Sequence, residues 1–240
     1  MQESLFADSL PESSETLDEV NAEMVGRAGR LPQFRERVFI FGVGQLNASV
    51  AVVGESPGPP DIDSGKPFMG PAGQMLERIL AAIGLRREAC YLTNTVKIIS
   101  TGDEMTPDVL SFFTPYLHRE LAVVKPRIII SFGNTPTRAL LGTKKPISQL
   151  RGEFHDYRGM QLMPTFNPAY LLRDPSKKRE VWEDMKKVRA FSLHQVAIRN
   201  ETLSSTAIHF FVRKDKEIIV DSSPQGVYKL DLIIFSVSSV

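Results

Sequence analysis

Short apolar segments recur along the chain, and most of them end in a glycine or a small polar residue. The clearest are "SVAVVGE" at 49–55, "YLTNTVK" at 91–97, "PRIIISFG" at 126–133 and "MQLMPTF" at 160–166. Runs of this length are typical of strands, and a continuous apolar run is typical of a strand buried on both faces of a parallel sheet. The pattern predicts a fifth strand in "RVFIFGVG" at 37–44.

Between these runs the apolar residues recur at helical spacing. The segment "GPAGQMLERILAAIGL" places one apolar stripe on a helix face and then reaches Gly84, a natural helix end; the stripe is Met75, Leu76, Ile79, Leu80 and Ile83. Thr106 followed by Pro107 predicts the cap and first turn of a second helix, inside which Pro115 is expected to cause a kink. Further helices are predicted at 135–142 and 175–191.

Strands that alternate with helices predict an α/β fold. We expect three layers, α/β/α, around a central, mostly parallel four-stranded sheet, with ligands bound at the carboxyl ends of its strands. The main domain is predicted at 30–195. Residues 1–29 are rich in Ser and Glu and are expected to form an acidic, mostly disordered lead with one short helix near 16–25. Residues 196–240 are expected to form a β-rich extension of unknown role.

Composition and charge limit the class of protein, its compartment and the kind of partner. The 240 residues are 42% hydrophobic and 24% charged, which is ordinary for a globular protein, and no apolar run approaches the ~20 residues of a membrane-spanning helix. A single cysteine, Cys90, excludes an internal disulfide framework and predicts a cytoplasmic protein. The net charge is +1, but residues 1–20 contribute −6 and 197–240 contribute zero, so 21–196 carry +7. A basic middle permits a polyanionic partner.

The candidate chemistry follows the strands. A loop rich in Pro and Gly, "GESPGPPDIDSGKPF" at 54–68, follows the first, Asn94 ends the second, and "TFNPAYLLR" at 165–173 follows the last. No GxGxxG, GxxxxGK[ST] or HExxH motif is present, which disfavours dinucleotide, nucleoside triphosphate and zinc chemistry.

These segments together resemble the iron–sulfur (family 4) uracil-DNA glycosylases. The resemblance extends in order over residues 34–188 and includes "VVGESPGPPDIDSGKPFMGPAGQMLERIL", "YLTNTVK", "ISQLRGEF" and "PTFNPAYLLRDPSKKREVWEDMKKV". It implies an enzyme that flips uracil out of DNA into a pocket and hydrolyses its bond to the sugar.

The resemblance also implies roles for residues that would bind the base. Phe68 would stack on the flipped uracil, and the Asn94 amide would donate to O4 and accept from N3–H, a combination that suits uracil. Glu55 and Ser56 belong to the same pocket. Without the resemblance, the favoured interpretation is that Phe68 is a core aromatic and that Asn94 makes a turn bond at a strand end.

Two residues are the candidate catalytic groups. Asp61 matches an acidic residue thought to place or polarise the attacking water, although it is one methylene shorter than the more usual Glu; loop capping is its alternative role. Asn167 stands where the iron–sulfur family usually carries a His that donates to uracil O2. An Asn amide also has N–H donors, and the mismatch-specific uracil/thymine glycosylases carry an Asn–Pro pair in the comparable motif.

The residues after Asn167 are candidates for contact with DNA. In the family interpretation they lie against phosphates and the minor groove. They are Pro168, Tyr170, Arg173, Lys177 and Lys178. As a charge run alone, the basic residues would simply form a solvated helix face.

The resemblance fails at the iron–sulfur cluster. The family ligates a [4Fe–4S] centre with four Cys. Ile98 and Phe113 occupy two of those positions, and Cys90 matches none of the four. We therefore expect no cluster, no other metal and no cofactor, with apolar packing in the place of the cluster.

The sequence thus predicts a monomeric, membrane-independent uracil-DNA glycosylase whose partner is DNA that contains uracil. Two alternatives remain: a DNA- or damage-binding module that has lost turnover, and an accessory domain associated with replication.

Overall fold

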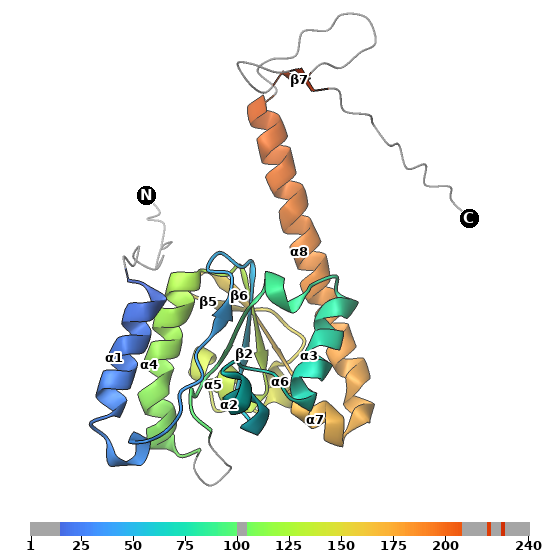
Figure 1. Cartoon of the computed structure of the whole chain (residues 1–240). Coiled ribbons are helices and arrows are strands. Elements are labelled where there is room, and N and C mark those ends of the chain that lie inside the picture. The colour runs from blue at the N-terminus through green and yellow to red at the C-terminus, as the bar shows by residue number, and fades with distance from the viewer. Residues whose placement is uncertain (1–14, 100–104, 208–219, 222–226, 229–240) are drawn as a thin grey trace, which may run out of the picture. The chain divides into compact units, whose positions relative to one another are not determined.

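The computed structural model describes residues 15–99, 105–207, 220–221 and 227–228 (Figure 1). The chain divides into two compact units, residues 1–190 and 191–240. The first unit contains a six-stranded sheet in the order β1-β3-β2-β4-β6-β5. Its strands are β1 (Val43–Gly44), β2 (Val50–Gly54), β3 (Tyr91–Asn94), β4 (Ile128–Phe132), β5 (His155–Tyr157) and β6 (Met160–Thr165).

The four central strands confirm the predicted parallel sheet. β3, β2, β4 and β6 pair in parallel, whereas the short edge strands β1 and β5 pair antiparallel to β3 and β6. The two edge strands extend the predicted four strands to six. All residues of β2, β3 and β4 are buried, as their apolar runs predict for strands covered on both faces.

The strand predicted at 37–44 is much shorter than expected, because only Val43 and Gly44 pair with β3. Upstream, the Ile40 N–H donates to the Lys97 carbonyl over 2.7 Å. Phe39 and Phe41 pack against a cluster that includes Phe113. The apolar residues of this segment therefore cover the core rather than build the sheet.

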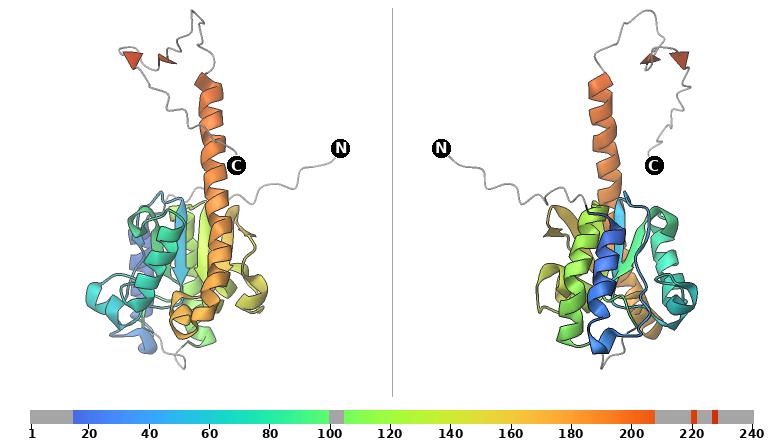
Figure 2. Two further views of the ribbon diagram at one scale, coloured as in Figure 1. Left: turned by 90° about the vertical axis from the view of Figure 1, so that its right-hand side faces the viewer. Right: turned by 60° about the vertical axis from the view of Figure 1, so that its left-hand side comes forward.

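Helices cover both faces of the sheet. Figures 1 and 2 show α1 and α4 on one face, and α3, α7 and the start of α8 on the other. The helices are α1 (Leu17–Ala28), α2 (Pro59–Ser64), α3 (Pro71–Ala82), α4 (Pro107–Val124), α5 (Asn134–Leu141), α6 (Ile147–Leu150), α7 (Pro168–Arg173) and α8 (Lys178–Ala207), with 3-10 turns η1 (Pro32–Phe34), η2 (Arg87–Ala89) and η4 (Pro175–Lys177). The three predicted α/β/α layers are therefore present.

Helix α1 lies within the segment expected to be a disordered lead. Thr16 and Glu19 form a reciprocal capping box at its start. Val20, Met24 and Ala28 are buried, and α1 packs along α4. The short predicted helix is thus longer than expected and belongs to the folded unit, because its i, i+4, i+8 stripe is apolar. Residues 1–14 lie outside the described residues.

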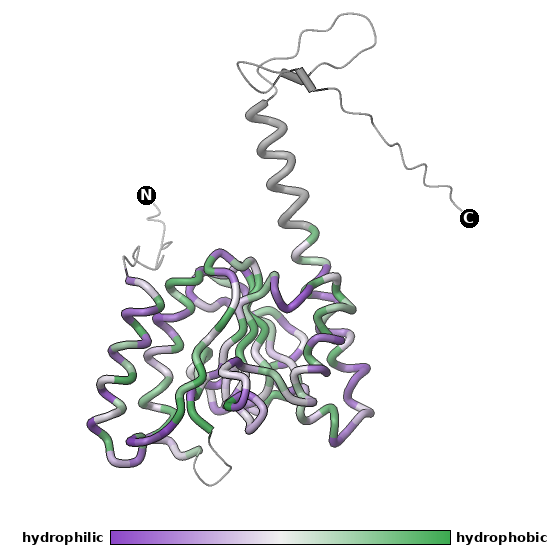
Figure 3. Tube along the Cα trace, in the orientation of Figure 1, coloured by the Kyte–Doolittle hydropathy of each residue, from purple (hydrophilic) through white to green (hydrophobic). Residues whose placement is uncertain are grey.

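The hydrophobic core follows the central strands. Figure 3 shows apolar residues along the sheet and polar residues on the outer faces of the helices. A second cluster, which we call the aromatic cluster, lies between α1 and α4. It contains Phe34, Phe112, Phe113 and Tyr116, with ring centroids of successive pairs 4.7–5.7 Å apart, together with Ile98. Offset and tilted packing at such distances is favourable for aromatic rings.

Helix α8 continues to Ala207, past the predicted boundary at 195. No Gly or Pro interrupts residues 178–207, which explains the extra turns. In the second unit the described strands β7 (Val220–Asp221) and β8 (Val227–Tyr228) pair antiparallel. Residues 196–207 of the predicted β-rich extension are therefore helical, and the remaining residues of that prediction, 208–219, 222–226 and 229–240, lie outside the described residues. Within the part of the chain that is described, no helix is long and apolar enough to cross a membrane.

The packing of α1 can be tested by truncating its buried methionine. Met24 is fully buried, so Met24→Ala should lower the free energy of unfolding by about 2–5 kcal/mol through lost burial and a residual cavity. Urea denaturation measures this change. Val25→Ala is the matched control, since the neighbouring Val25 is 40% exposed and should cost far less. Equal effects of the two substitutions would show that α1 does not pack on the domain.

Candidate active site

The register of the parallel strands brings the candidate residues to one edge of the sheet. Gly54 at the end of β2 lies opposite Asn94 at the end of β3, and Phe132 at the end of β4 lies opposite Thr165 at the end of β6. β2 lies between β3 and β4, so the chain passes from β2 to β3 on one side and then crosses to β4 on the other side of β2. In open α/β sheets the carboxyl ends of strands at such a switch point form a ligand crevice.

Two adjoining cavities open at this edge. The first, of about 270 Å³, is lined by all six residues predicted to bind or act on the base: Glu55, Ser56, Asp61, Phe68, Asn94 and Asn167. The second, of about 490 Å³, shares Glu55, Ser56 and Asn167 with the first and is also lined by Tyr170 and Arg173. The tertiary structure therefore brings together residues from three separate loops.

Asp61 holds the loop that closes the first cavity. Its side chain is 6% exposed, and both carboxylate oxygens accept backbone N–H groups. Oδ2 accepts from Gly58 over 3.0 Å, which caps α2, and Oδ1 accepts from Met69 over 2.7 Å. The loop capping that the sequence left open as an alternative is present.

Phe68, Gly54 and Asn94 meet at the floor of the first cavity. A Cβ atom added to Gly54 would lie 2.6 Å from Phe68 Cζ and 2.3 Å from Asn94 Oδ1, so a glycine is required here. Gly73 is required as well, because a Cβ there would lie 1.8 Å from the Phe68 carbonyl oxygen. The Phe68 ring is therefore a wall of the cavity rather than part of the described hydrophobic core.

The Asn94 side chain carries an unsatisfied donor. Asn94 is 2% exposed, and its Nδ2 atom is one of two buried side-chain polar atoms without a hydrogen-bond partner among the described residues. A buried unsatisfied donor costs about 1–3 kcal/mol and calls for an explanation. Because Asn94 lines the cavity, a ligand acceptor would satisfy it.

Asn167 presents its amide to both cavities. Its Oδ1 accepts from the Ala169 N–H over 2.8 Å and caps α7, which fixes the amide orientation. Its Nδ2 makes only a long contact of 3.4 Å with the Phe132 carbonyl. An amide nitrogen carries two N–H groups, so a donor remains for a ligand.

Glu55 is the carboxylate shared by the two cavities. Thr135, at the start of α5, donates to Glu55 Oε2 over 2.8 Å. This bond ties the loop after β2 to the loop after β4 across the switch point.

A buried ion pair lies directly behind Asn94. The Lys97 ammonium donates to Glu120 over 2.5 Å and to the Asn94 carbonyl over 2.8 Å, and Thr93 and Tyr91 donate to Glu120 over 2.9 and 2.7 Å. Both charged side chains are at most 3% exposed. Burial raises the pKa of the Tyr91 hydroxyl, which therefore remains a donor. The network fixes the backbone from which the Asn94 amide projects.

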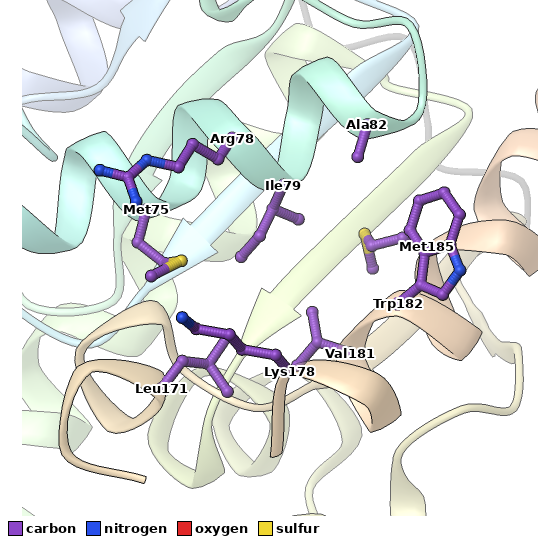
Figure 4. A pocket seen from close by; sticks show the side chains of 9 residues that line it. All are labelled: Met75, Arg78, Ile79, Ala82, Leu171, Lys178, Val181, Trp182 and Met185. Carbon is purple, nitrogen blue, oxygen red and sulfur yellow. The ribbon is translucent and has the colours of Figure 1, made fainter. Parts of the chain in front are cut away.

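The five residues predicted to contact DNA are not grouped together. Tyr170 and Arg173 line the second cavity, but Pro168 is buried in the first turn of α7. Lys177 pairs with Glu180 over 2.7 Å. Lys178 lies at a separate, mainly apolar pocket between α3, α7 and α8, shown in Figure 4, which also contains Trp182.

Comparison with known proteins supports the assignment that the geometry suggests. A family model described as the uracil DNA glycosylase superfamily matches residues 41–186, which include every residue that lines the two cavities. The chain belongs to the uracil-DNA glycosylase superfamily.

Individual proteins are similar to this chain over much of its length. A protein of Thermotoga maritima named type-4 uracil-DNA glycosylase is 33% identical over 183 residues, 74% of this chain and 95% of the relative. A protein of the same name from Pyrobaculum aerophilum is 33% identical over 174 residues, 68% of this chain and 88% of the relative. A DNA polymerase of Bacillus phage SP01 is 29% identical over 136 residues, 56% of this chain but only 15% of the polymerase.

The residues present do not fit a [4Fe–4S] cluster. Such a cluster takes four thiolates, and this superfamily member has one cysteine. Cys90 is buried, and burial raises the pKa of its thiol to about 11, which disfavours the thiolate. Ile98 and Phe113 lie instead in the aromatic cluster. Within the described residues no three His, Cys, Asp or Glu side chains gather as metal ligands.

The sequence did not single out three residues that organise the site. Gly54 follows a strand, as many glycines do, and only the close approach of Phe68 and Asn94 distinguishes it. Thr135 contacts Glu55, and Lys97 contacts Glu120 on α4. Both partners are distant in the sequence, so local pattern does not reveal these contacts. For Lys97, the one available sequence signal was its position three residues after Asn94 at the end of a strand.

The ion pair behind Asn94 gives a second stability test. Lys97→Met leaves the Glu120 charge buried without its partner, so the free energy of unfolding should fall by about 3–5 kcal/mol. Lys186→Met removes a cation from the exposed pair with Glu183 and should change it by less than about 1 kcal/mol. Chemical denaturation of both variants provides the measurement. A small effect of Lys97→Met would show that Glu120 finds water or another partner.

Proposed function

We propose that this protein excises uracil from DNA by hydrolysing the N-glycosidic bond. The observation that carries the proposal is the buried, unsatisfied Asn94 Nδ2 donor, which belongs to a side chain that lines the cavity at the switch point together with Phe68. Membership of the uracil-DNA glycosylase superfamily and the relatives named type-4 uracil-DNA glycosylase support the same activity.

Base recognition follows from these two side chains. A base inside a duplex cannot reach such a cavity, so it must be flipped out. The face of Phe68 then offers a stacking surface. The Asn94 Nδ2 group would donate to uracil O4, and its Oδ1 would accept from N3–H. Cytosine presents a donor in place of O4, so it would leave the Asn94 donor unsatisfied.

Hydrolysis breaks the bond between C1′ and N1 and joins a water oxygen to C1′. The departing uracil takes the electron pair of the broken bond as an anion, and the Asn167 Nδ2 group would donate to its O2. We assign the water to Glu55, which faces both cavities, rather than to Asp61, whose two oxygens bind the loop backbone. The Glu55 carboxylate would accept the proton that the water loses.

The second cavity is proposed to receive the sugar and phosphate beside the flipped base. Arg173 supplies a cation and Tyr170 a hydroxyl group for phosphate oxygens, and Pro168 begins the helix that carries them. Lys177 and Lys178 would add positive potential rather than direct contacts. We also propose that the protein acts as a monomer, in the cytoplasm.

We also propose that the protein works without an iron–sulfur cluster. The sequence has one cysteine, so four thiolate ligands are not available. Ile98 and Phe113, at two of the ligand positions, pack within the aromatic cluster. The rings would then supply the packing between α1 and α4 for which the family uses metal ligation.

The proposed activity can be tested with oligonucleotides that carry one deoxyuridine, single- and double-stranded. Incubation followed by alkaline cleavage should yield strand breaks at the uracil position. Asn94→Ala should lower the rate by about 10²–10³-fold, since it removes the donor and acceptor that hold the base. Asn47→Ala, at an exposed position, is the matched control and should retain activity.

The same oligonucleotides, used in a gel shift as well as in the cleavage assay, test the alternative function. A gel shift that is stronger for DNA containing uracil, without strand breaks even at high protein concentration, would reject the enzyme and support a damage-binding module.

Elemental analysis tests the proposed absence of the cluster. Protein purified without oxygen should contain far less than one iron per chain and show no absorbance of an iron–sulfur centre, and chelators should leave excision unchanged. Four irons per chain would contradict the proposal.

A further inference from the structure

The backbone of Phe68 adopts a conformation that is unfavourable for a residue with a side chain. Its φ angle is +60°, in the left-handed region that Gly, Asn and Asp enter more readily. A strained residue persists only where its surroundings hold it, and such residues gather at functional sites. Phe68 carries the ring that lies against Asn94 in the cavity, so the group that holds its backbone also sets the position of the ring.

Arg87 is the group that holds this peptide. Its guanidinium donates through Nη2 to the Pro67 carbonyl over 2.7 Å, and through both Nη atoms to the Phe68 carbonyl over 3.1 Å. Glu77 on α3 accepts from Arg87 Nη1 over 2.9 Å and fixes the guanidinium from the other side. The planar fork of an arginine can reach two carbonyls at once, which a lysine ammonium does less well.

Asp61 completes the restraint from the opposite direction. It accepts from the N–H of Met69, the residue after Phe68, over 2.7 Å. Arg87 and Asp61 therefore grip consecutive peptides on both sides of the Phe68 side chain. Gly73 allows this arrangement, because any side chain there would collide with the Phe68 carbonyl that Arg87 binds.

Arg87, which holds the Phe68 peptide, and Asn94 lie at the two ends of one short segment of the chain. Arg87 begins η2, which leads directly into β3, and β3 ends at Asn94. One end of this short segment thus holds the stacking ring, and the other end presents the amide that reads the base. A change at Arg87 would alter the spacing between the ring and the amide without touching either.

We propose that Arg87, fixed by Glu77, is a positioning residue that holds the Phe68 ring at stacking distance from the flipped base. This proposal rests on the proposed function, because it assigns Phe68 to the base. It goes beyond that function in naming the group that sets the width of the pocket. Arg87 touches neither base nor sugar in this arrangement. Its side chain is only 18% exposed, so its loss also removes packing, and thermal unfolding of each variant measures that contribution separately.

The test compares Arg87→Ala with Arg86→Ala on the uracil oligonucleotides. Arg86 is the exposed neighbour, so both variants remove one positive charge from the same turn. Loss of the charged hydrogen bonds at Arg87 should lower kcat/KM about 10–100-fold, whereas Arg86→Ala should lower it less than about threefold. Equal losses would overturn the proposal, because they would indicate only an effect on DNA attraction.

A double-mutant cycle with Phe68→Ala separates positioning from a general structural role. If Arg87 acts through the ring, Arg87→Ala should change kcat/KM by less than about twofold once the ring is absent, so the two losses should be strongly non-additive. Full additivity would overturn the proposal. Arg87→Lys and Glu77→Gln should give intermediate losses, and they carry the test if Arg87→Ala proves unstable in thermal unfolding.

Binding distinguishes a failure of this inference from a failure of the proposed function. If the wild-type protein excises no uracil, the proposed activity fails, and the inference is then tested by gel shift. Arg87→Ala should reduce the preference for DNA containing uracil over undamaged DNA about tenfold, while Arg86→Ala should leave it unchanged. An unchanged preference in Arg87→Ala would overturn the inference.

Discussion

Gly54 ends strand β2 without a side chain, and the arrangement of the first cavity depends on the space that this leaves. Asn94 Oδ1 and the Phe68 ring occupy the volume in which a Cβ atom would lie. Parallel pairing sets Gly54 opposite Asn94, and the loop after β2 folds back to place Phe68 over both. The Asn94 amide and the Phe68 ring can be neighbours only because Gly54 has no side chain to occupy the space beside them.

Hydrogen bonds hold the backbone around the first cavity in place. Asp61 and Arg87 hold the peptides around Phe68, and the Lys97–Glu120 pair holds the carbonyl of Asn94. A buried ion pair is weak support for stability, since desolvation offsets much of its attraction. Its location behind the amide favours a positional role. Fixed donors of this kind bind without having to reorganise, which is the main source of electrostatic catalysis.

The aromatic cluster provides the packing between α1 and α4. Rings from η1 and α4 meet at contact distances beside Ile98, and the apolar stripe of α1 covers them. Burial of this much aromatic surface is a strong stabilising contribution for a short helix. The composition of residues 1–29 did not reveal that α1, which begins in an acidic segment, packs into this core.

The sequence by itself determined the class of fold and the identity of the pocket residues. Apolar runs ending in Gly or Asn predicted the four parallel strands, because local pattern reports burial on both faces. Through the family resemblance, the motifs after those strands also predicted six of the residues that line the first cavity. The roles within the cavity were decided only by the tertiary structure. Whether Asp61 faces a water or the backbone, and which cation holds Phe68, depends on contacts between segments distant in the chain, and local pattern carries no information about them.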